Sequence, residues 1–152
     1  MGKSGRENHI PDAAVDRIGR SLSAIQSSIS KRETAEIALL TQQNLTVSEV
    51  HTLTAISAED VCPMRRVAEQ LGVTLSTLTI SINRLVVKGY VNRIRSENDQ
   101  RVVFLNLTPK GIEIVTAHAA FHDALIRELL GDLSANEALA LANGLAGLAE
   151  RS

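Results

Sequence analysis

The chain has 152 residues, of which 44% are hydrophobic, 22% are charged and 2% are aromatic. This length suits one compact domain with helical extensions, and the composition is too apolar for a disordered chain. The sequence lacks the apolar run of roughly 18 residues that a membrane-spanning helix needs, and its first residues lack the apolar centre of a signal peptide. These absences predict a cytoplasmic protein with no membrane partner. The single cysteine, Cys62, cannot form an internal disulfide, which also suits a reducing compartment.

The formal net charge of −1 is unevenly distributed along the chain. Residues 63–110 contain eight basic and three acidic residues, a balance of +5, whereas the rest contains eight basic and fourteen acidic residues, a balance of −6. A local excess of cations is typical of a surface that binds the phosphates of nucleic acid. An ordinary solvated charged surface would give the same count. The charge alone therefore makes residues 63–110 only a candidate nucleic-acid-binding region.

An amphipathic helix is predicted after a polar, flexible tail of residues 1–11. From Asp12, which we predict to be the N-cap, apolar residues recur at steps of three and four. They are Val15, Ile18, Leu22, Ile25 and Ile29. The polar run 30–34 is expected to bend or end this helix, and residues 12–45 are assigned as an N-terminal dimerisation region.

Two further helices are predicted from their end signals. Thr46 and Glu49 form a capping box, in which each side chain pairs with a free backbone N–H, and the helix that follows is expected to end near Ala58. Pro63 suits the first position of a short third helix, which Gly72 ends.

A fourth helix is predicted to begin after an N-cap at Thr74 and to end before Gly89, where a left-handed C-cap fits. Its predicted inner face consists of Leu75, Leu78, Ile82, Leu85 and Val86. The opposite face then carries Ser76, Thr77, Ile80, Ser81 and Arg84.

A β-hairpin is predicted next, because residues 90–95 and 102–107 alternate in hydrophobicity and flank a polar loop. Two helices follow, one after the Thr108 cap and Pro109, the other after a capping box of Ser134 and Glu137. We therefore assign residues 46–108 to a DNA-binding domain and residues 109–152 to C-terminal dimerisation helices.

This order predicts a mainly α fold with a small β wing, a winged helix-turn-helix with terminal dimerisation helices. The fourth helix is the candidate for insertion into the major groove, where hydroxyl and guanidinium groups contact base edges and phosphates. Arg95 and Arg101 flank the wing tip, and Asp99 is expected to orient Arg101. The predicted DNA-binding residues are Arg65, Thr74, Ser76, Thr77, Ser81, Arg84, Arg95, Asn98 and Arg101.

The wing resembles that of the multiple-antibiotic-resistance regulator (MarR) family of bacterial repressors. The family's signature, Asp-x-Arg, five residues and Leu-Thr, is matched by residues 99–108, and Pro109-Lys110-Gly111 continues it. The resemblance covers about residues 15–148 and implies that residues 74–88 read DNA while Arg101 contacts the minor groove. It also implies a homodimeric repressor of palindromic operators, with a small effector binding between the dimerisation helices and the DNA-binding domain.

The predicted helices support a homodimer independently of this resemblance. The apolar stripes at the two ends of the sequence exceed what one small winged-helix core can cover. Burying them across a two-fold axis would remove them from water, and palindromic half-sites follow from that symmetry. A monomer with both arms folded back is the alternative.

Two kinds of effector fit the sequence. His118 and His122 are four residues apart on a predicted helix, a spacing suited to metal ligands. With Glu33 and His51 they resemble the ligand set of the family's zinc-uptake repressors, which implies a zinc cofactor. The stretches 45–53 and 91–107 instead resemble the fatty-acid-synthesis repressors, for which the effector is a fatty-acyl ligand, and the sequence leaves both possibilities open.

An enzyme is not expected, because the sequence lacks the nucleophile-elbow, dinucleotide-binding and His-Glu-x-x-His motifs. A zinc hydrolase using Glu33, His118 and His122 is the least implausible enzyme. A winged helix used for protein contacts is a remote alternative. Cys62, next to Pro63 at a helix start, is expected to be packed rather than to sense oxidation.

Overall fold

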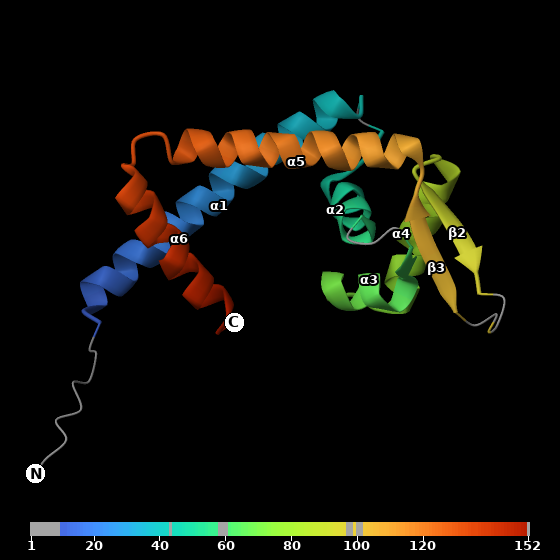
Figure 1. The fold of residues 1–152 in the computed structure, drawn as a ribbon, viewed down its shortest axis with the longest axis horizontal. Coiled ribbons are helices and arrows are strands. Elements are labelled where there is room, and N and C mark those ends of the chain that lie inside the picture. The colour runs from blue at the N-terminus through green and yellow to red at the C-terminus, as the bar shows by residue number, and fades with distance from the viewer. Residues whose placement is uncertain (1–9, 43, 58–60, 97–98, 100–101, 152) are drawn as a thin grey trace, which may run out of the picture. The chain divides into compact units, whose positions relative to one another are not determined.

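The computed structural model describes residues 10–42, 44–57, 61–96, 99 and 102–151. These residues form six helices and three short strands, which confirms the predicted mainly α fold with a small β wing (Figure 1). The chain divides into two compact units, residues 1–47 and 48–152. The boundary falls at the start of the second helix.

The first unit contains one long helix, α1 (Asp12–Leu40). Its N-cap is Pro11, so the prediction of Asp12 as the N-cap is wrong. Asp12 lies in the first turn, where its negative carboxylate interacts favourably with the positive end of the helix dipole. The helix also does not end at residues 30–34, where the sequence predicted that it would bend or end. The Thr34 hydroxyl donates to the Ser30 carbonyl at 2.8 Å, so a polar side chain is satisfied within the continuous helix.

The second unit begins with α2 (Val47–Ile56), α3 (Met64–Leu71) and α4 (Leu75–Val87). Its hydrophobic core is made chiefly of aliphatic side chains with almost no exposure. They include Val50, Leu53, Ile56, Val67, Leu78, Ile82, Leu85 and Leu105. Burying each such side chain contributes roughly 1.5–3 kcal/mol before the entropy of ordering is subtracted.

The turn between α3 and α4 is the predicted one. Gly72 has a φ of 64° and ends α3 in the left-handed region, where a residue without Cβ is not strained. The Thr74 hydroxyl then accepts from Thr77 N and caps α4. Gly89 has a φ of 80° just beyond the other end of α4, as predicted.

Two residues predicted on the inner face of α4 are exposed instead. Leu75 is 45% exposed and Val86 is 37% exposed. Leu75 is the first residue of the helix, and Val86 lies at the edge of the stripe formed by Leu78, Ile82 and Leu85. The apolar pattern therefore predicted a wider buried face than the helix has.

A three-stranded antiparallel sheet follows, with strand order β1-β3-β2. The hairpin strands are β2 (Val91–Arg95) and β3 (Val103–Leu107), close to the predicted ranges. The third strand, β1 (Cys62–Pro63), pairs Cys62 with Leu105 and was not predicted. Pro63 belongs to this strand and is the N-cap of α3, so its prediction as the first helical residue is wrong.

Two helices complete the second unit, α5 (Pro109–Leu129) and α6 (Ala135–Ala149). Thr108 caps α5 with Pro109 at its first turn, and Ser134 and Glu137 form the predicted capping box of α6. Hydrogen bonds from the Ser134 hydroxyl and, secondarily, from its backbone N–H lower the pKa of the Glu137 carboxyl. Within the described part of the chain, no helix combines the length and apolar character needed to cross a membrane.

Candidate nucleic-acid interface

The outer face of α4 presents the predicted groups to solvent. Ser76, Thr77 and Arg84 are exposed, and Ser81 is half-buried at the side of the helix. Thr74, at the N-cap, is exposed as well, and so is Arg65 on α3. Because residues 76, 80 and 84 are one turn apart, they form a single stripe of hydroxyl, alkyl and guanidinium groups.

The hydroxyl of Thr77 is already engaged at the helix start. Thr74 Oγ1 and Thr77 Oγ1 are 3.0 Å apart and share a hydrogen bond, and Thr74 Oγ1 also accepts from Thr77 N at 3.2 Å. Two residues beyond Thr77, the Thr79 hydroxyl donates to the Leu75 carbonyl, one helical turn back, at 2.7 Å. Thr77 therefore has a structural part in the cap as well as its predicted place on the DNA-facing side.

The wing strand β2 is tied to α4 by an arginine that the sequence reasoning missed. Arg93 Nη1 donates to Asn83 Oδ1 at 2.7 Å, and Arg93 Nη2 approaches Met64 Sδ at 3.9 Å. Arg93 and Arg95 lie two residues apart on one face of β2, and with Val103 they line a pocket of about 270 Å³. Arg95 was predicted because it flanks the wing tip, whereas the alternation of side chains along a strand, which places Arg93 on the same face, was not used.

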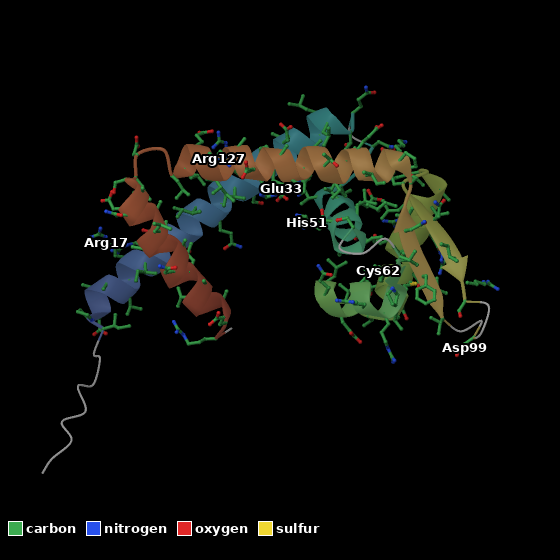
Figure 2. The ribbon with its side chains drawn as sticks, in the orientation of Figure 1. Arg17, Glu33, His51, Cys62, Asp99 and Arg127 are labelled. Carbon is green, nitrogen blue, oxygen red and sulfur yellow. The ribbon has the colours of Figure 1, made fainter. Side chains whose placement is uncertain are left out.

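The turn at the wing tip is held by backbone groups. Ser96 N donates to the Val102 carbonyl at 3.0 Å, and Val102 N donates to the Asp99 carbonyl at 2.9 Å. The backbone N–H of Asp99 donates to Ser96 Oγ at 3.3 Å, and the exposed Asp99 side chain lies at the end of the hairpin (Figure 2). Asn98 and Arg101 lie outside the described residues, so the predicted pairing of Asp99 with Arg101 stays a prediction.

The far end of α4 is anchored by a largely buried ion pair. Lys88 Nζ lies 2.9 Å from both carboxylate oxygens of Glu49, and the side chains are 28% and 7% exposed. Lys110 Nζ donates to the Lys88 carbonyl at 3.2 Å and lies 4.1 Å from the centre of the Tyr90 ring. This cluster, Glu49, Lys88, Tyr90 and Lys110, joins α2, the end of α4, the start of the wing and the start of α5.

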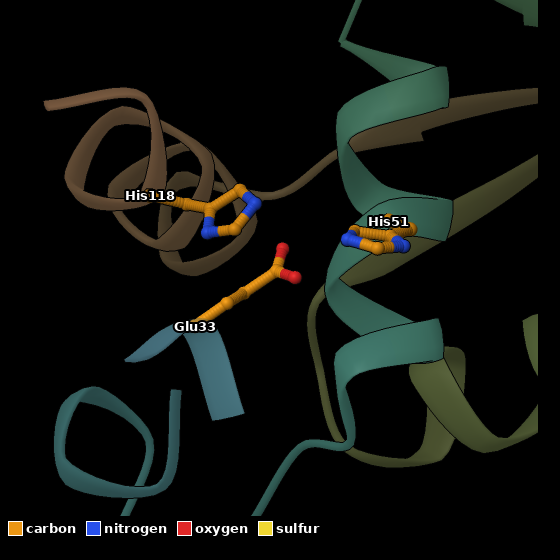
Figure 3. A group of neighbouring side chains, drawn as sticks. All are labelled: Glu33, His51 and His118. Atoms are coloured by element: carbon orange, nitrogen blue, oxygen red, sulfur yellow. The ribbon is translucent and has the colours of Figure 1, made fainter. Parts of the chain in front are cut away.

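A histidine cluster lies between α2 and α5. The ring centroids of His51 and His118 are 6.0 Å apart, and those of His118 and His122 are 4.5 Å apart with the rings perpendicular. A ring nitrogen of His51 and one of His118 lie within 4.8 Å of each other, and His118 is only 4% exposed. Figure 3 draws these two rings with Glu33, the carboxylate predicted as a further ligand, which belongs to the first unit.

Imidazole nitrogens at these separations can converge on one small cation. Zinc takes nitrogen and carboxylate ligands at about 2.0–2.2 Å in tetrahedral geometry, so any two ligand atoms of one ion lie roughly 3–4 Å apart. The nearest ring nitrogens of His51 and His118, within 4.8 Å of each other, are close to that range. The residues of the second unit therefore fit a zinc site, with His122 one helical turn beyond His118.

Cys62 is a packed residue, in keeping with its expected role. Its side chain is 2% exposed, and Sγ lies 3.8 Å from the Pro63 carbonyl oxygen (Figure 2). A thiol that solvent does not reach reacts slowly with oxidants, because attack requires an accessible thiolate.

Comparisons with known proteins agree with this geometry. The family described as "Transcriptional regulator SarA/Rot" matches residues 37–117. The chain is 34% identical over 95 residues to the transcriptional regulator ZitR of Lactococcus lactis, a match that covers 61% of this chain and 65% of ZitR. It is 30% identical over 103 residues to the multiple antibiotic resistance protein MarR of Salmonella typhimurium, covering 67% of this chain and 72% of MarR.

Solved structures show the same architecture. The crystal structure of Streptococcus pneumoniae FabT in complex with DNA is 33% identical and superposes with a TM-score of 0.84, covering 90% of this chain and 95% of FabT. The matched family and ZitR are described as transcriptional regulators, which agrees with the prediction that the chain is not an enzyme. The matched family, the similarity to MarR and the shared winged-helix fold establish that the chain belongs to the MarR family of transcriptional regulators.

Proposed function

We propose that the chain is a sequence-specific DNA-binding transcriptional regulator that acts as a homodimer on palindromic operators. The observation that carries this proposal is the continuous surface of α4 and β2, joined by the bond between Arg93 and Asn83. The exposed groups of α4 suit base edges and phosphates, and Arg95 with Arg93 offers two cations for the backbone. FabT, which shares the fold, has been crystallised with DNA.

The homodimer is supported by apolar side chains that a single chain leaves exposed. In α6, where no residue is buried, four leucines are between 43% and 62% exposed. They are Leu139, Leu141, Leu145 and Leu148. In α1 the predicted stripe from Val15 to Ile25 is about half exposed. A second copy would cover such surfaces and space two α4 helices for successive major grooves.

The mode of regulation follows from occupancy of the operator. A dimer bound at a promoter excludes other proteins from the same duplex, and we therefore expect a repressor. Effector binding between the dimerisation helices and the winged helix would change the spacing of the two α4 helices and so the affinity for DNA.

Zinc is the effector that the histidine cluster supports. We propose that His51, His118 and His122 bind zinc and that Glu33 of the first unit is a further ligand. Bound zinc would supply a fixed cross-link between α2 and α5. His51 and Glu49 both lie on α2, and Glu49 is held by Lys88 at the end of α4. A shift of α2 on zinc binding at His51 can therefore be passed directly to α4, the proposed DNA-binding helix.

DNA binding is tested by titrating promoter fragments at several salt concentrations. Arg95→Met is expected to weaken binding to every duplex and to reduce the slope of log affinity against log salt by about 2 for a dimer, because each lost phosphate contact removes about 0.9. Arg127→Met, which removes an exposed arginine on α5, should keep the wild-type slope. Sedimentation of the same samples should give two chains per free particle and two per duplex; monomers without duplex affinity would refute the proposal.

Zinc binding is tested by equilibrium dialysis with elemental analysis on protein without a histidine tag. His118→Ala removes a proposed zinc ligand. It is therefore expected to lower the zinc affinity by more than roughly 10–100-fold, which is the effect of losing a residue that only hydrogen-bonds to a ligand. Glu33→Gln should lose affinity as well, whereas Glu113→Gln, an exposed carboxylate on the same helix as His118, should not. Unchanged zinc affinity in His118→Ala would contradict the site, and a response of DNA binding to a fatty-acyl ligand alone would favour the other effector.

A further inference from the structure

Between Ser76 and Arg84, the exposed stripe of α4 carries one large apolar side chain, Ile80. Ile80 is 57% exposed, although it lies in the middle of the helix rather than at an end. Its neighbours one turn away on the same stripe are Ser76 and Arg84, both exposed. The apolar surface of Ile80 is therefore separate from the buried stripe formed by Leu78, Ile82 and Leu85.

Neither stability nor helix formation explains an isoleucine at this position. Its β-branched side chain is restricted in a helix, and alanine or a long polar residue is preferred where packing does not decide. Exposed apolar area also gains nothing from folding. A residue that breaks local preference on a surface proposed to bind a partner is a candidate for a role in that contact.

We propose that Ile80 is a specificity-determining residue that contacts the C5-methyl group of a thymine in each half-site. This inference rests on the proposed DNA binding and names one chemical feature of the operator. In the major groove each base pair presents hydrogen-bonding groups, and the thymine methyl is the apolar group that an alkyl side chain can contact. The stiff, branched side chain of Ile80 presents its methyl groups with little rotamer entropy to lose.

Two of the other exposed apolar residues of α4, Val87 and Leu75, suit this contact less well. Val87 is 87% exposed and shares the stripe, but it is seven residues further along, a rise of about 10 Å towards the end held by Lys88. Leu75 lies at the first position of the helix and, by helical periodicity, off the stripe. Recognition helices contact bases through their N-terminal part, which places Ile80 nearer to the bases than Val87.

The experiment compares duplexes that differ only in thymine methyl groups. An operator is selected from a random duplex library with the wild-type protein, then prepared with thymine or with uracil at every T position. The wild-type protein is expected to bind the uracil duplex roughly fourfold more weakly for each methyl contact, or about 15-fold for a palindrome with two contacts. Ile80→Ala should bind the thymine duplex more weakly and lose this discrimination, with a thymine-to-uracil affinity ratio near one.

Val87→Ala is the matched control, because it also shortens an exposed β-branched residue on the same stripe. It should keep the wild-type ratio, and thermal unfolding should show that both variants fold. A wild-type ratio near one, an Ile80→Ala ratio equal to that of the wild type, or an equal loss in Val87→Ala would overturn the assignment to Ile80 while leaving DNA binding intact. A selection that enriches no sequence would overturn the proposed function and this inference together.

Discussion

Lys88→Met is expected to lower the free energy of unfolding by about 3 kcal/mol, at the lower end of the range for a broken buried ion pair. The substitution leaves the Glu49 carboxylate, only 7% exposed, without a cation that holds both its oxygens at 2.9 Å. The value is at the lower end because the Lys88 side chain is 28% exposed and water screens part of the interaction. Urea unfolding at a fixed protein concentration measures the effect and avoids a shift from dimer dissociation.

The pair between Arg127 and Asp123 provides the control for Lys88→Met. Its nitrogen and oxygen are also 2.9 Å apart, but the side chains are 77% and 67% exposed. Arg127→Met should therefore cost less than about 0.5 kcal/mol, the usual value of an exposed pair on one helix. An equal loss of unfolding free energy in the two variants would contradict the argument that burial strengthens the Glu49–Lys88 pair.

Gly111→Ala is expected to destabilise the protein by about 2 kcal/mol, although alanine favours helices by about 1 kcal/mol. A Cβ at this position would overlap the Tyr90 carbonyl oxygen and would lie 3.4 Å from two side-chain atoms of Leu107. That carbonyl oxygen cannot easily move, because it accepts from Thr108 N at 3.0 Å. Thermal unfolding should show a midpoint lower by several degrees.

Gly144→Ala is the matched substitution at a helical position that is open within the single chain. Nothing lies within 4 Å of a Cβ added there, so the gain in helix propensity should raise the stability by up to about 1 kcal/mol. A stabilised Gly111→Ala variant would show that the first turn of α5 can move away from β2.

The elements that the sequence predicted best are those with chemical end signals. Thr74, Thr108 and Ser134 each accept a backbone N–H at a helix start, and Gly72 adopts the left-handed conformation beyond α3. Such signals depend on a few neighbouring residues, so they can be read locally. The two errors in α1 arose where a polar side chain was satisfied inside the helix or where proline took the cap position.

The parts that sequence reasoning missed depend on distant partners. Strand β1 has two residues and exists because Cys62 pairs with Leu105, which is 43 positions away along the sequence. The bond between Arg93 and Asn83 likewise depends on how β2 lies against α4. The outer face of α4 was predictable because helical periodicity alone defines it. The engagement of the Thr77 hydroxyl by Thr74 shows that a polar residue on that face can also serve the helix itself.

The two margins of the small sheet have a consequence for solubility. Unpaired strand edges invite pairing with other molecules, and proteins discourage this with very short strands, proline or charged side chains. One margin here is β1, which has two residues and ends in proline, and the other is β2, which carries Arg93 and Arg95. Growth of the sheet into aggregates is therefore opposed on both sides, so the wing can remain extended in concentrated solution without recruiting further chains.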